Sequence, residues 1–355
     1  MVAARGGLRA VVGGVAATAL GTALTAAALV PAGGAQAATG GGFQQVDLVS
    51  DVPGMAQLTD PAVVNPWGIA LGPTTPLWVA NNGTSTATIY TGANGSDPVS
   101  KVRLTVTTPA QPTGQVFNST SAFALRGKPA PFLFDTLSQR VAAWSPQVPP
   151  PTLARTTARV ANHVYLGLAI ARTGQGPRLL AADGGGRIDV FDTRYRLIAH
   201  PRTFTDPMLP RGLGPYNVAV LGNRVYVSYA PAPGATASVD GAINVFDLNG
   251  RLVRRLVTGG PLEEPWGMVM APAHWGRFGG MLLVGNEDGG RINAFDPATG
   301  AFRGTLRDAA GAPLANDGLW GLAFGNGAFG TPRTLIFAAG IDEYTHGLVG
   351  TISPN

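Results

Sequence analysis

The sequence repeats one short motif, which reads Asn65-Pro66-Trp67-Gly68-Ile69-Ala70-Leu71 in its first clear copy. It returns as Glu264-Pro265-Trp266-Gly267-Met268-Val269-Met270 and as Gly318-Leu319-Trp320-Gly321-Leu322-Ala323-Phe324. Weaker copies start at Leu166 and Tyr216, and the weakest is Ser121-Ala122-Phe123-Ala124-Leu125. Successive copies lie about 50 residues apart, a period typical of repeat architectures such as propellers.

Each copy is followed by the same series of features. A second apolar segment comes next, as at residues 77–80 and 225–229, and a polar turn such as Asn81-Asn82-Gly83 follows it. A third segment alternates in period two, which is a strand pattern; examples are Ile188-Asp189-Val190-Phe191, Ile243-Asn244-Val245-Phe246 and Ile292-Asn293-Ala294-Phe295. A turn that begins with Asp and a fourth strand complete the unit. Four short strands per unit predict a propeller blade.

Six such units fit between Pro66 and the carboxyl terminus, so we expect an all-β, six-bladed β-propeller with four-stranded blades. The sixth unit ends soon after its third strand. The spare apolar segment at residues 43–49 can supply the missing strand, which would close the ring and remove an exposed sheet edge. The predicted propeller domain therefore covers residues 43–355.

Composition narrows the class of protein. The chain has 355 residues with 50 Gly, 29 Pro and no Cys, and 45% of it is hydrophobic, which is not the composition of a disordered chain. The absence of Cys excludes a disulfide framework, thiolate metal sites and a cysteine nucleophile. The formal charge of +5 is carried by scattered arginines, and no basic run interleaved with aromatics occurs. We therefore expect no nucleic-acid partner.

Residues 1–37 have the pattern of a secretory signal peptide. Arg5 and Arg9 precede a long uncharged apolar run, and Ala35-Gln36-Ala37 is a small-x-small cleavage site. Residues 38–42 then form a short flexible leader. The alternative is an uncleaved membrane anchor, because the apolar run is about long enough to span a bilayer. With cleavage, we expect a secreted or cell-wall-associated monomer with no stable membrane span.

The repeats and the run from Asp183 to Asp192 resemble an uncharacterised family of secreted bacterial six-bladed propellers. That family is distantly similar to NHL-repeat propellers and to the gluconolactonase, regucalcin and paraoxonase group. The resemblance to the uncharacterised family covers nearly all of the predicted domain. The resemblance to the enzymes is one of repeat and fold, and a shared fold does not by itself imply a shared function.

Polar residues next to the inner strands are the candidate site, because these strands line the central channel of a propeller. The residues are Asn65, Asn118, His163, Asn217, Glu264 and Asp317. Side-chain oxygens from several blades would suit Ca²⁺, which takes roughly six to eight oxygen ligands. The resemblance to the lactonase-type propellers implies Asn65, Asn217, Glu264 and Asp317 as the metal ligands. The alternative is that they are ordinary turn residues.

Two further predictions concern the channel. Trp67, Trp266 and Trp320 are expected to line it, where blade packing is enough to explain them. In a lactonase-type enzyme His163 would be the general base, with Asp317 or Glu264 as alternatives. No Gly-x-Ser-x-Gly nucleophile elbow and no phosphate-binding glycine loop is found.

Three functions remain open at this point. The first is a binding propeller that holds a small-molecule or cell-surface ligand at the channel mouth and its loops. The second is a calcium-dependent lactonase or esterase, in which the metal would polarise the carbonyl. The third is a lyase that acts on an extracellular substrate. Sparse histidines and the lack of a catalytic motif favour the first.

Overall fold

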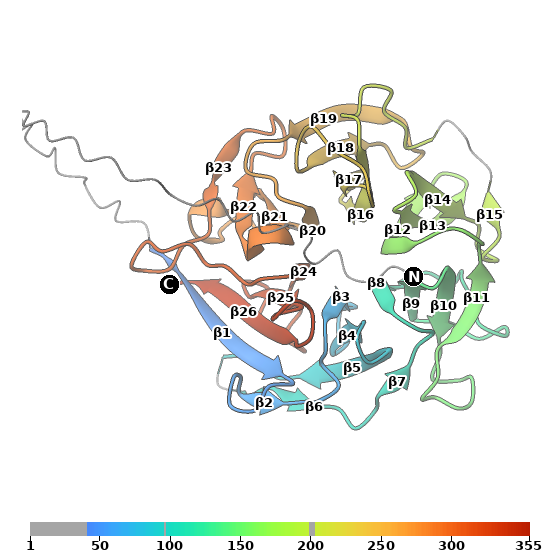
Figure 1. The fold of residues 1–355 in the computed structure, drawn as a ribbon. Coiled ribbons are helices and arrows are strands. Elements are labelled where there is room, and N and C mark those ends of the chain that lie inside the picture. The colour runs from blue at the N-terminus through green and yellow to red at the C-terminus, as the bar shows by residue number, and fades with distance from the viewer. Residues whose placement is uncertain (1–40, 96, 199–202) are drawn as a thin grey trace, which may run out of the picture. The chain divides into compact units, whose positions relative to one another are not determined.

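The computed structural model describes residues 41–95, 97–198 and 203–355. Six antiparallel sheets surround a common axis (Figure 1), which confirms the predicted six-bladed β-propeller. The predicted signal peptide, residues 1–37, and residues 38–40 of the leader lie outside the described residues. Within the described ranges, no helix is long and apolar enough to cross a membrane.

The strands occupy equivalent places in the six blades. The inner strands are β3 (Pro66–Ala70), β8 (Pro112–Phe117), β12 (Tyr165–Thr173), β16 (Leu213–Leu221), β20 (Pro265–Met270) and β24 (Leu319–Phe324). The second strands are β4 (Leu77–Asn81), β9 (Phe132–Thr136), β13 (Gly176–Asp183), β17 (Arg224–Pro231), β21 (Leu282–Asn286) and β25 (Leu335–Ala339). The third strands are β5 (Thr86–Thr91), β10 (Arg140–Trp144), β14 (Arg187–Phe191), β18 (Ala242–Phe246), β22 (Ile292–Phe295) and β26 (Leu348–Pro354).

The outer strands are shorter and less regular. They are β6 (Ser100–Lys101), β11 (Arg155–Arg159), β15 (Leu197–Ile198), β19 (Leu252–Thr258), β23 (Phe302–Thr305) and, in blade six, β1 (Phe43–Ser50). Strand β7 (Val106–Thr107) also pairs with β5, and β2 (Leu58–Thr59) adds a short parallel strand to β1. Two short 3₁₀ turns, η1 (Gly276–Phe278) and η2 (Asp288–Gly290), lie in blade five.

The amino-terminal strand closes the ring as predicted. Strand β1 pairs antiparallel with β26, from Phe43 opposite Pro354 to Ser50 opposite Leu348. Figure 1 shows the blue first strand lying beside the red last one. The Phe43 ring is 2% exposed and lies 4.7 Å from the ring of Trp275. Closure therefore buries an aromatic side chain as well as pairing a sheet edge.

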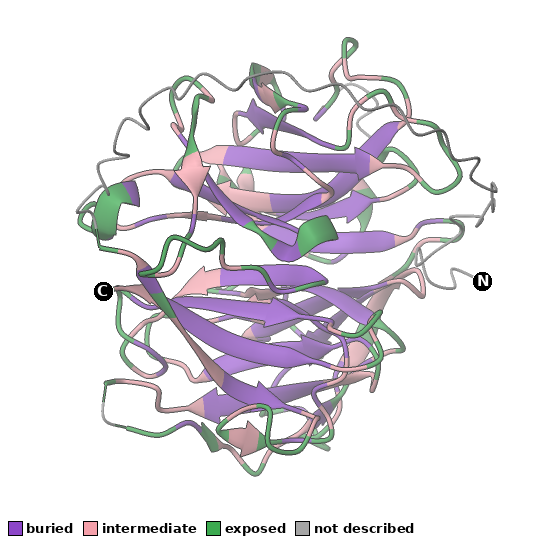
Figure 2. Ribbon diagram, turned by 60° about the vertical axis from the view of Figure 1, so that its left-hand side comes forward, coloured by how far each residue is buried: buried purple, intermediate pink, exposed green. Residues whose placement is uncertain are grey.

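The core is divided among the blades. Six hydrophobic clusters each fill the space between two neighbouring blades, and a seventh lies on the axis. Figure 2 shows burial along the strands, with the exposed residues mostly in the connecting loops. Along the third strands, alternate apolar residues such as Ile188 and Val190 pack into the cluster between blades three and four, while Phe191 packs into the cluster between blades two and three.

A ring of small residues lets the inner strands approach one another at the axis. A Cβ added to Gly68 would lie 2.5 Å from the Thr113 carbonyl oxygen of the next blade, and one added to Gly321 would lie 2.6 Å from that of Trp67. The Trp-Gly pairs of the sequence repeat are thus explained by close backbone approach. In blade four the equivalent residue is Asn217, whose side chain fills the gap beside the neighbouring strand.

The predicted inner strand of blade two was wrong. That strand is β8, where Thr113 and Gly114 occupy the places of Trp67 and Gly68. The predicted segment at residues 121–125 is a loop. Its residues are as apolar as those of a strand because they pack into the core between blades two and three. Asn118 therefore follows its inner strand instead of preceding it. Its amide donates to the carbonyls of Ala122 and Ala130, so it holds this loop and does not line the channel mouth.

Candidate functional site

One backbone hydrogen bond recurs on the face where the inner strands begin. It joins the residue before the inner strand to the first residue after the second strand. The donor–acceptor pairs are Asn82–Asn65, Leu137–Gln111, Gly184–Val164, Ala232–Gly212, Glu287–Glu264 and Gly340–Gly318, with N···O distances of 2.8–3.0 Å. The fold therefore brings two positions of each blade together beside the axis. Only blade five has acidic side chains at both positions.

An aromatic plug lies just inside this mouth. Trp67 and Trp320 stack with ring centroids 3.7 Å apart, and Trp266 meets each of them edge-on at 6.3 and 6.0 Å. Leu166 and Tyr216 complete the cluster from blades three and four. The three tryptophans therefore lie together at the channel axis and fill it at this level.

The indole N–H groups of the plug are all paired. Those of Trp67 and Trp320 both donate to the side-chain oxygen of Asn65, at 2.9 and 3.0 Å, and that of Trp266 donates to the Leu166 carbonyl at 2.9 Å. A buried indole is stable only when its N–H has an acceptor. Asn65 therefore orients two rings of the plug.

The carboxyl groups of Glu264 and Glu287 form a close pair above the plug. Glu287 is 5% exposed, and its backbone N–H donates to the Glu264 carbonyl at 2.9 Å. Burial, followed by the neighbouring Glu264 carboxyl, raises the pKa of Glu287 from 4.5 to about 8. Burial and a neighbouring carboxyl both favour the uncharged form, so Glu287 keeps its proton at neutral pH.

Tyr344 completes this group from blade six. Its hydroxyl donates to the Glu287 carboxyl, and its ring lies 5.9 Å from that of Trp320. Burial and the charge of Glu287 raise the pKa of Tyr344, so the phenol remains a donor. Gly318 and Gly340 leave room for the ring, because a Cβ on either would lie 3.1 Å from it.

The backbone at this site is strained in several places. Asp342, Glu343 and Tyr344 have consecutive positive φ angles of 52°, 53° and 67°, and Glu264 has a φ of 50°. Non-glycine residues in the left-handed region cost roughly 1–2 kcal/mol each. Such strain tends to gather at functional sites, where the surrounding structure holds it in place.

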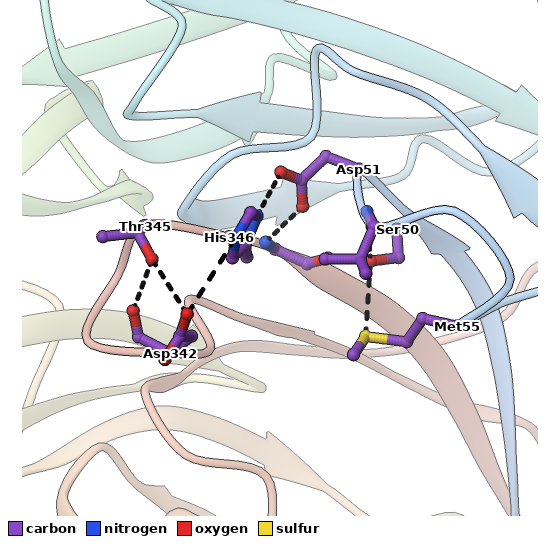
Figure 3. A network of polar contacts seen from close by, with 8 residues as sticks. Ser50, Asp51, Met55, Asp342, Thr345 and His346 are labelled. Carbon is purple, nitrogen blue, oxygen red and sulfur yellow. Dashed lines mark hydrogen bonds and ion pairs between the residues drawn. The ribbon is translucent and has the colours of Figure 1, made fainter.

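A polar clamp holds the loop that carries Tyr344 (Figure 3). His346 Nδ1 lies 2.7 Å from Asp51 Oδ2, and the Gly347 N–H donates to Asp51 Oδ1 at 2.8 Å. The Ser50 hydroxyl donates to the Gly347 carbonyl at 2.7 Å. Because Ser50 and Asp51 belong to the closing segment, ring closure and the position of Tyr344 are connected.

The predicted calcium ligands do not share one site. The Asn65 oxygen already accepts two indole N–H groups, and the Asn217 oxygen accepts the Val218 N–H while its amide donates to the Trp266 carbonyl. Asp317 is exposed in the segment before β24. In the described part of the chain, no group of three or more His, Asp or Glu side chains could hold a metal ion. Of the four, only Glu264 lies in the carboxyl pair, so the structure does not bring the predicted ligands together, and calcium binding stays a prediction.

His163 lies in a different network. Its Nδ1 is 2.7 Å from Asp189 Oδ2, which also accepts the Tyr165 hydroxyl at 2.7 Å. The equivalent third-strand residues Asn244 and Asn293 fasten the preceding loops through Asp206 and the Pro261 carbonyl. His163 therefore occupies the blade-three version of a repeated loop fastening. Its predicted role as a general base stays a prediction.

Sequence reasoning missed two members of the site. Glu287 lies in the turn that follows the second strand of its blade, and Tyr344 lies between the second and third strands of blade six, so neither is among the candidate residues beside the inner strands. Aligning the blades at the residue that follows the second strand would have singled out Glu287, because it shares that position with Asn82. No sequence pattern indicates that Tyr344 reaches across to blade five.

The fold and this mouth define a six-bladed β-propeller with a plugged channel and a carboxyl pair at one end. The chain belongs to the family of two uncharacterised proteins of Acanthamoeba polyphaga mimivirus. One is 36% identical over 327 residues, covering 86% of this chain and 78% of the relative. The other is 36% identical over 330 residues, covering 86% and 84%.

The remaining comparisons concern the fold alone. No protein-family model matches the sequence. A solved structure of Kuenenia stuttgartiensis hydrazine synthase aligns with a TM-score of 0.52 at 18% identity, over 81% of this chain and 76% of that one. At that identity the similarity shows a common architecture. The bacterial and secreted parts of the family resemblance stay predictions.

Proposed function

We propose that this protein binds a small molecule at the channel mouth formed by Glu264, Glu287 and Tyr344. The observation that carries the proposal is the buried carboxyl of Glu287 beside the half-buried Glu264. Paired carboxyls without a cation destabilise a folded protein, because burial disfavours their charge and they repel one another. Among the described residues, no Lys, Arg or His forms an ion pair with Glu264 or Glu287. A ligand that hydrogen-bonds to the two carboxyls would offset the free-energy cost of holding them together.

The chemistry of the mouth suits a polar ligand. The pair offers one acidic proton and one carboxylate, so it can donate to and accept from the same molecule. The strained loop fixes the Tyr344 hydroxyl beside Glu287. Preorganised polar groups of this kind raise affinity because little order has to be created on binding.

A thermal-shift screen of polyols, ammonium compounds and lactones tests this proposal on the wild type, Glu287→Gln and Glu263→Gln. Glu263 precedes the pair in sequence and is 39% exposed, which makes it a matched control. We expect compounds that stabilise the wild type and Glu263→Gln but not Glu287→Gln. Stabilisation by the same compounds in all three proteins would place the ligand elsewhere, and a screen with no stabilising compound would count against a binding mouth.

A second candidate is a hydrolase in which Glu287 is the general acid. A carboxyl pKa of about 8 keeps the proton available at neutral pH, as general acid catalysis requires. Lactone and aryl-ester hydrolysis by the wild type and Glu287→Gln would test it. Turnover that falls at least about 100-fold in Glu287→Gln supports an enzyme, and turnover absent from both proteins removes this candidate.

The predicted calcium requirement has its own test. Residues 38–355 would be assayed for metal content and thermal stability with EDTA and with added Ca²⁺, in the wild type and in Glu264→Ala. A divalent ion that is bound by the wild type and lost in Glu264→Ala would support calcium. Equal thermal stability under all these conditions would count against calcium binding.

We also propose that the protein is exported from the cytoplasm. The apolar run and the Ala35-Gln36-Ala37 site support release of a monomeric propeller outside the cytoplasm, where its ligand would be a small molecule or a cell-surface component. Mass spectrometry of the protein recovered from the medium of its expression host would test this. Mature chains that begin at residue 38 support cleavage, and retention of the full chain in membranes would support the anchor.

A further inference from the structure

A cavity lies below the plug, on the side away from the carboxyl pair. The order of residues along each inner strand places it there: Glu264 lies at the mouth, Trp266 in the plug, and Gly267 and Met268 in the cavity wall. Because a strand advances about 3.3 Å per residue, the cavity starts within one or two residues of the plug. The buried rings of Trp67 and Trp320 separate it from the mouth.

All six inner strands contribute to the wall. The lining side chains are uncharged, and most are aliphatic; apart from glycines they are Ile69, Gln115, Val116, Leu168, Ala169, Ile170, Asn217, Val218, Ala219, Val220, Trp266, Met268 and Leu322. Each inner strand is also the edge of its sheet, so one row of main-chain groups faces the axis. The wall thus combines apolar side chains with neutral hydrogen-bonding groups, a pattern typical of small-molecule pockets.

Gln115 interrupts the apolar side chains. It occupies the strand position that Ile69 and Leu168 hold in neighbouring blades, and it is 7% exposed. Its Nε2 donates to the Trp78 carbonyl at 3.0 Å, while its Oε1 has no hydrogen-bond partner among the described residues. The amide is thus directed at blade one and its oxygen is fully enclosed, so the hydrogen-bonding groups that the cavity offers a ligand are the main-chain groups along the inner edge strands.

The size of the cavity limits the ligand. Its volume is about 250 Å³. A cavity of about 150 Å³ holds benzene, so this one accommodates on the order of ten non-hydrogen atoms. A charged ligand is disfavoured because no lining side chain carries an opposite charge.

We propose that this channel cavity is a second binding site, which takes an uncharged ring compound of about ten non-hydrogen atoms with a polar group that hydrogen-bonds to the main chain of the inner strands. The site is independent of the proposed function, because the plug separates it from the carboxyl pair. Its ligand would be uncharged, in contrast to the ligand of the mouth, which meets a carboxyl pair.

Benzamide and benzoate are matched probes, because they have nearly the same shape and differ in charge. Binding would be measured by calorimetry and by saturation-transfer NMR at pH 7. We expect benzamide to bind with a Kd of about 1 mM or tighter and benzoate at least tenfold more weakly. Equal binding of the two probes, or no saturable binding of benzamide, would overturn the proposal.

Substitutions in the cavity wall and at the mouth would show where benzamide binds. Ala219→Leu and Val220→Phe each enlarge a half-buried side chain of the wall, and either one that keeps its thermal midpoint within a few degrees should bind benzamide at least tenfold more weakly. Glu287→Gln should leave benzamide affinity unchanged. Benzamide binding that survives in a folded cavity variant, or that is lost in Glu287→Gln, would place the probe outside this cavity.

Discussion

Replacing Glu287 with Gln should stabilise the protein, and the gain should grow with pH. Burial and the Glu264 carboxyl raise the pKa of Glu287 from 4.5 to about 8. The folded state therefore holds a proton that the unfolded chain releases above pH 4.5. The contribution of this carboxyl to stability is fully present below pH 4.5, falls as the pH rises to about 8, and is constant above that.

The size of the effect follows from the same numbers. One pKa unit corresponds to 1.36 kcal/mol, so the carboxyl costs about 3 kcal/mol at pH 7 and approaches about 5 kcal/mol above pH 8. Gln avoids this cost because it has no proton to lose. Its amide oxygen can accept from Tyr344, and its amide nitrogen can donate to Glu264, so both contacts are retained.

Urea unfolding at pH 5, 7 and 9 would measure the difference in the free energy of unfolding between Glu287→Gln and the wild type. The difference should be at most about 1 kcal/mol at pH 5 and grow to about 5 kcal/mol at pH 9. Glu263→Gln should show no such trend. A Glu287→Gln difference that is flat across this range would refute the reasoning, because it would mean that Glu287 titrates in its ordinary range.

Three further predictions test the fold around the site. Gly321→Ala should destabilise the protein by about 1–3 kcal/mol in chemical unfolding, because its Cβ would lie 2.6 Å from a carbonyl oxygen of blade one; Gly174→Ala, whose Cβ meets nothing within 4 Å, should not. Phe43→Ala should lower the free energy of unfolding by about 3–5 kcal/mol, because this ring is buried when the ring of blades closes. Phe302→Ala, at a residue that is 48% exposed, should lower it by less than about 1 kcal/mol. Equal losses in the two variants would mean that closure buries little apolar surface. The hydrogen bond that His346 donates to Asp51 raises the pKa of His346, so the stability that this clamp provides should be present below pH 6.5 and lost as the pH rises through the raised pKa. The gap in thermal midpoint between the wild type and His346→Gln should therefore narrow from pH 5.5 to pH 9, and a constant gap would contradict the clamp.

Much of the fold could be predicted because its signals are local. Period-two alternation marks the strands and Asp marks the turns, and both depend on residues close together in sequence. In blades three, four and five the turn aspartates pair with an arginine a few residues on, as between Asp192 and Arg196. The spare segment that begins at Phe43 could be assigned to ring closure because the sixth unit lacked a strand. The prediction of the inner strand in blade two failed because the buried loop residues Phe123 and Leu125 are as hydrophobic as the residues of a strand.

The sequence by itself determined the six-bladed ring, its closure and the presence of aromatic residues at the axis, because a regular repeat leaves few other ways to pair the strands. Only the tertiary structure decided what those residues do. Asn65 was a plausible metal ligand until its oxygen was found to accept two indole N–H groups, one of them from Trp320 in another blade. The carboxyl pair exists because the blade geometry joins Glu264 to Glu287, and because a left-handed turn brings Tyr344 over from blade six. Such contacts depend on the direction of side chains from distant segments, which a one-dimensional pattern does not specify.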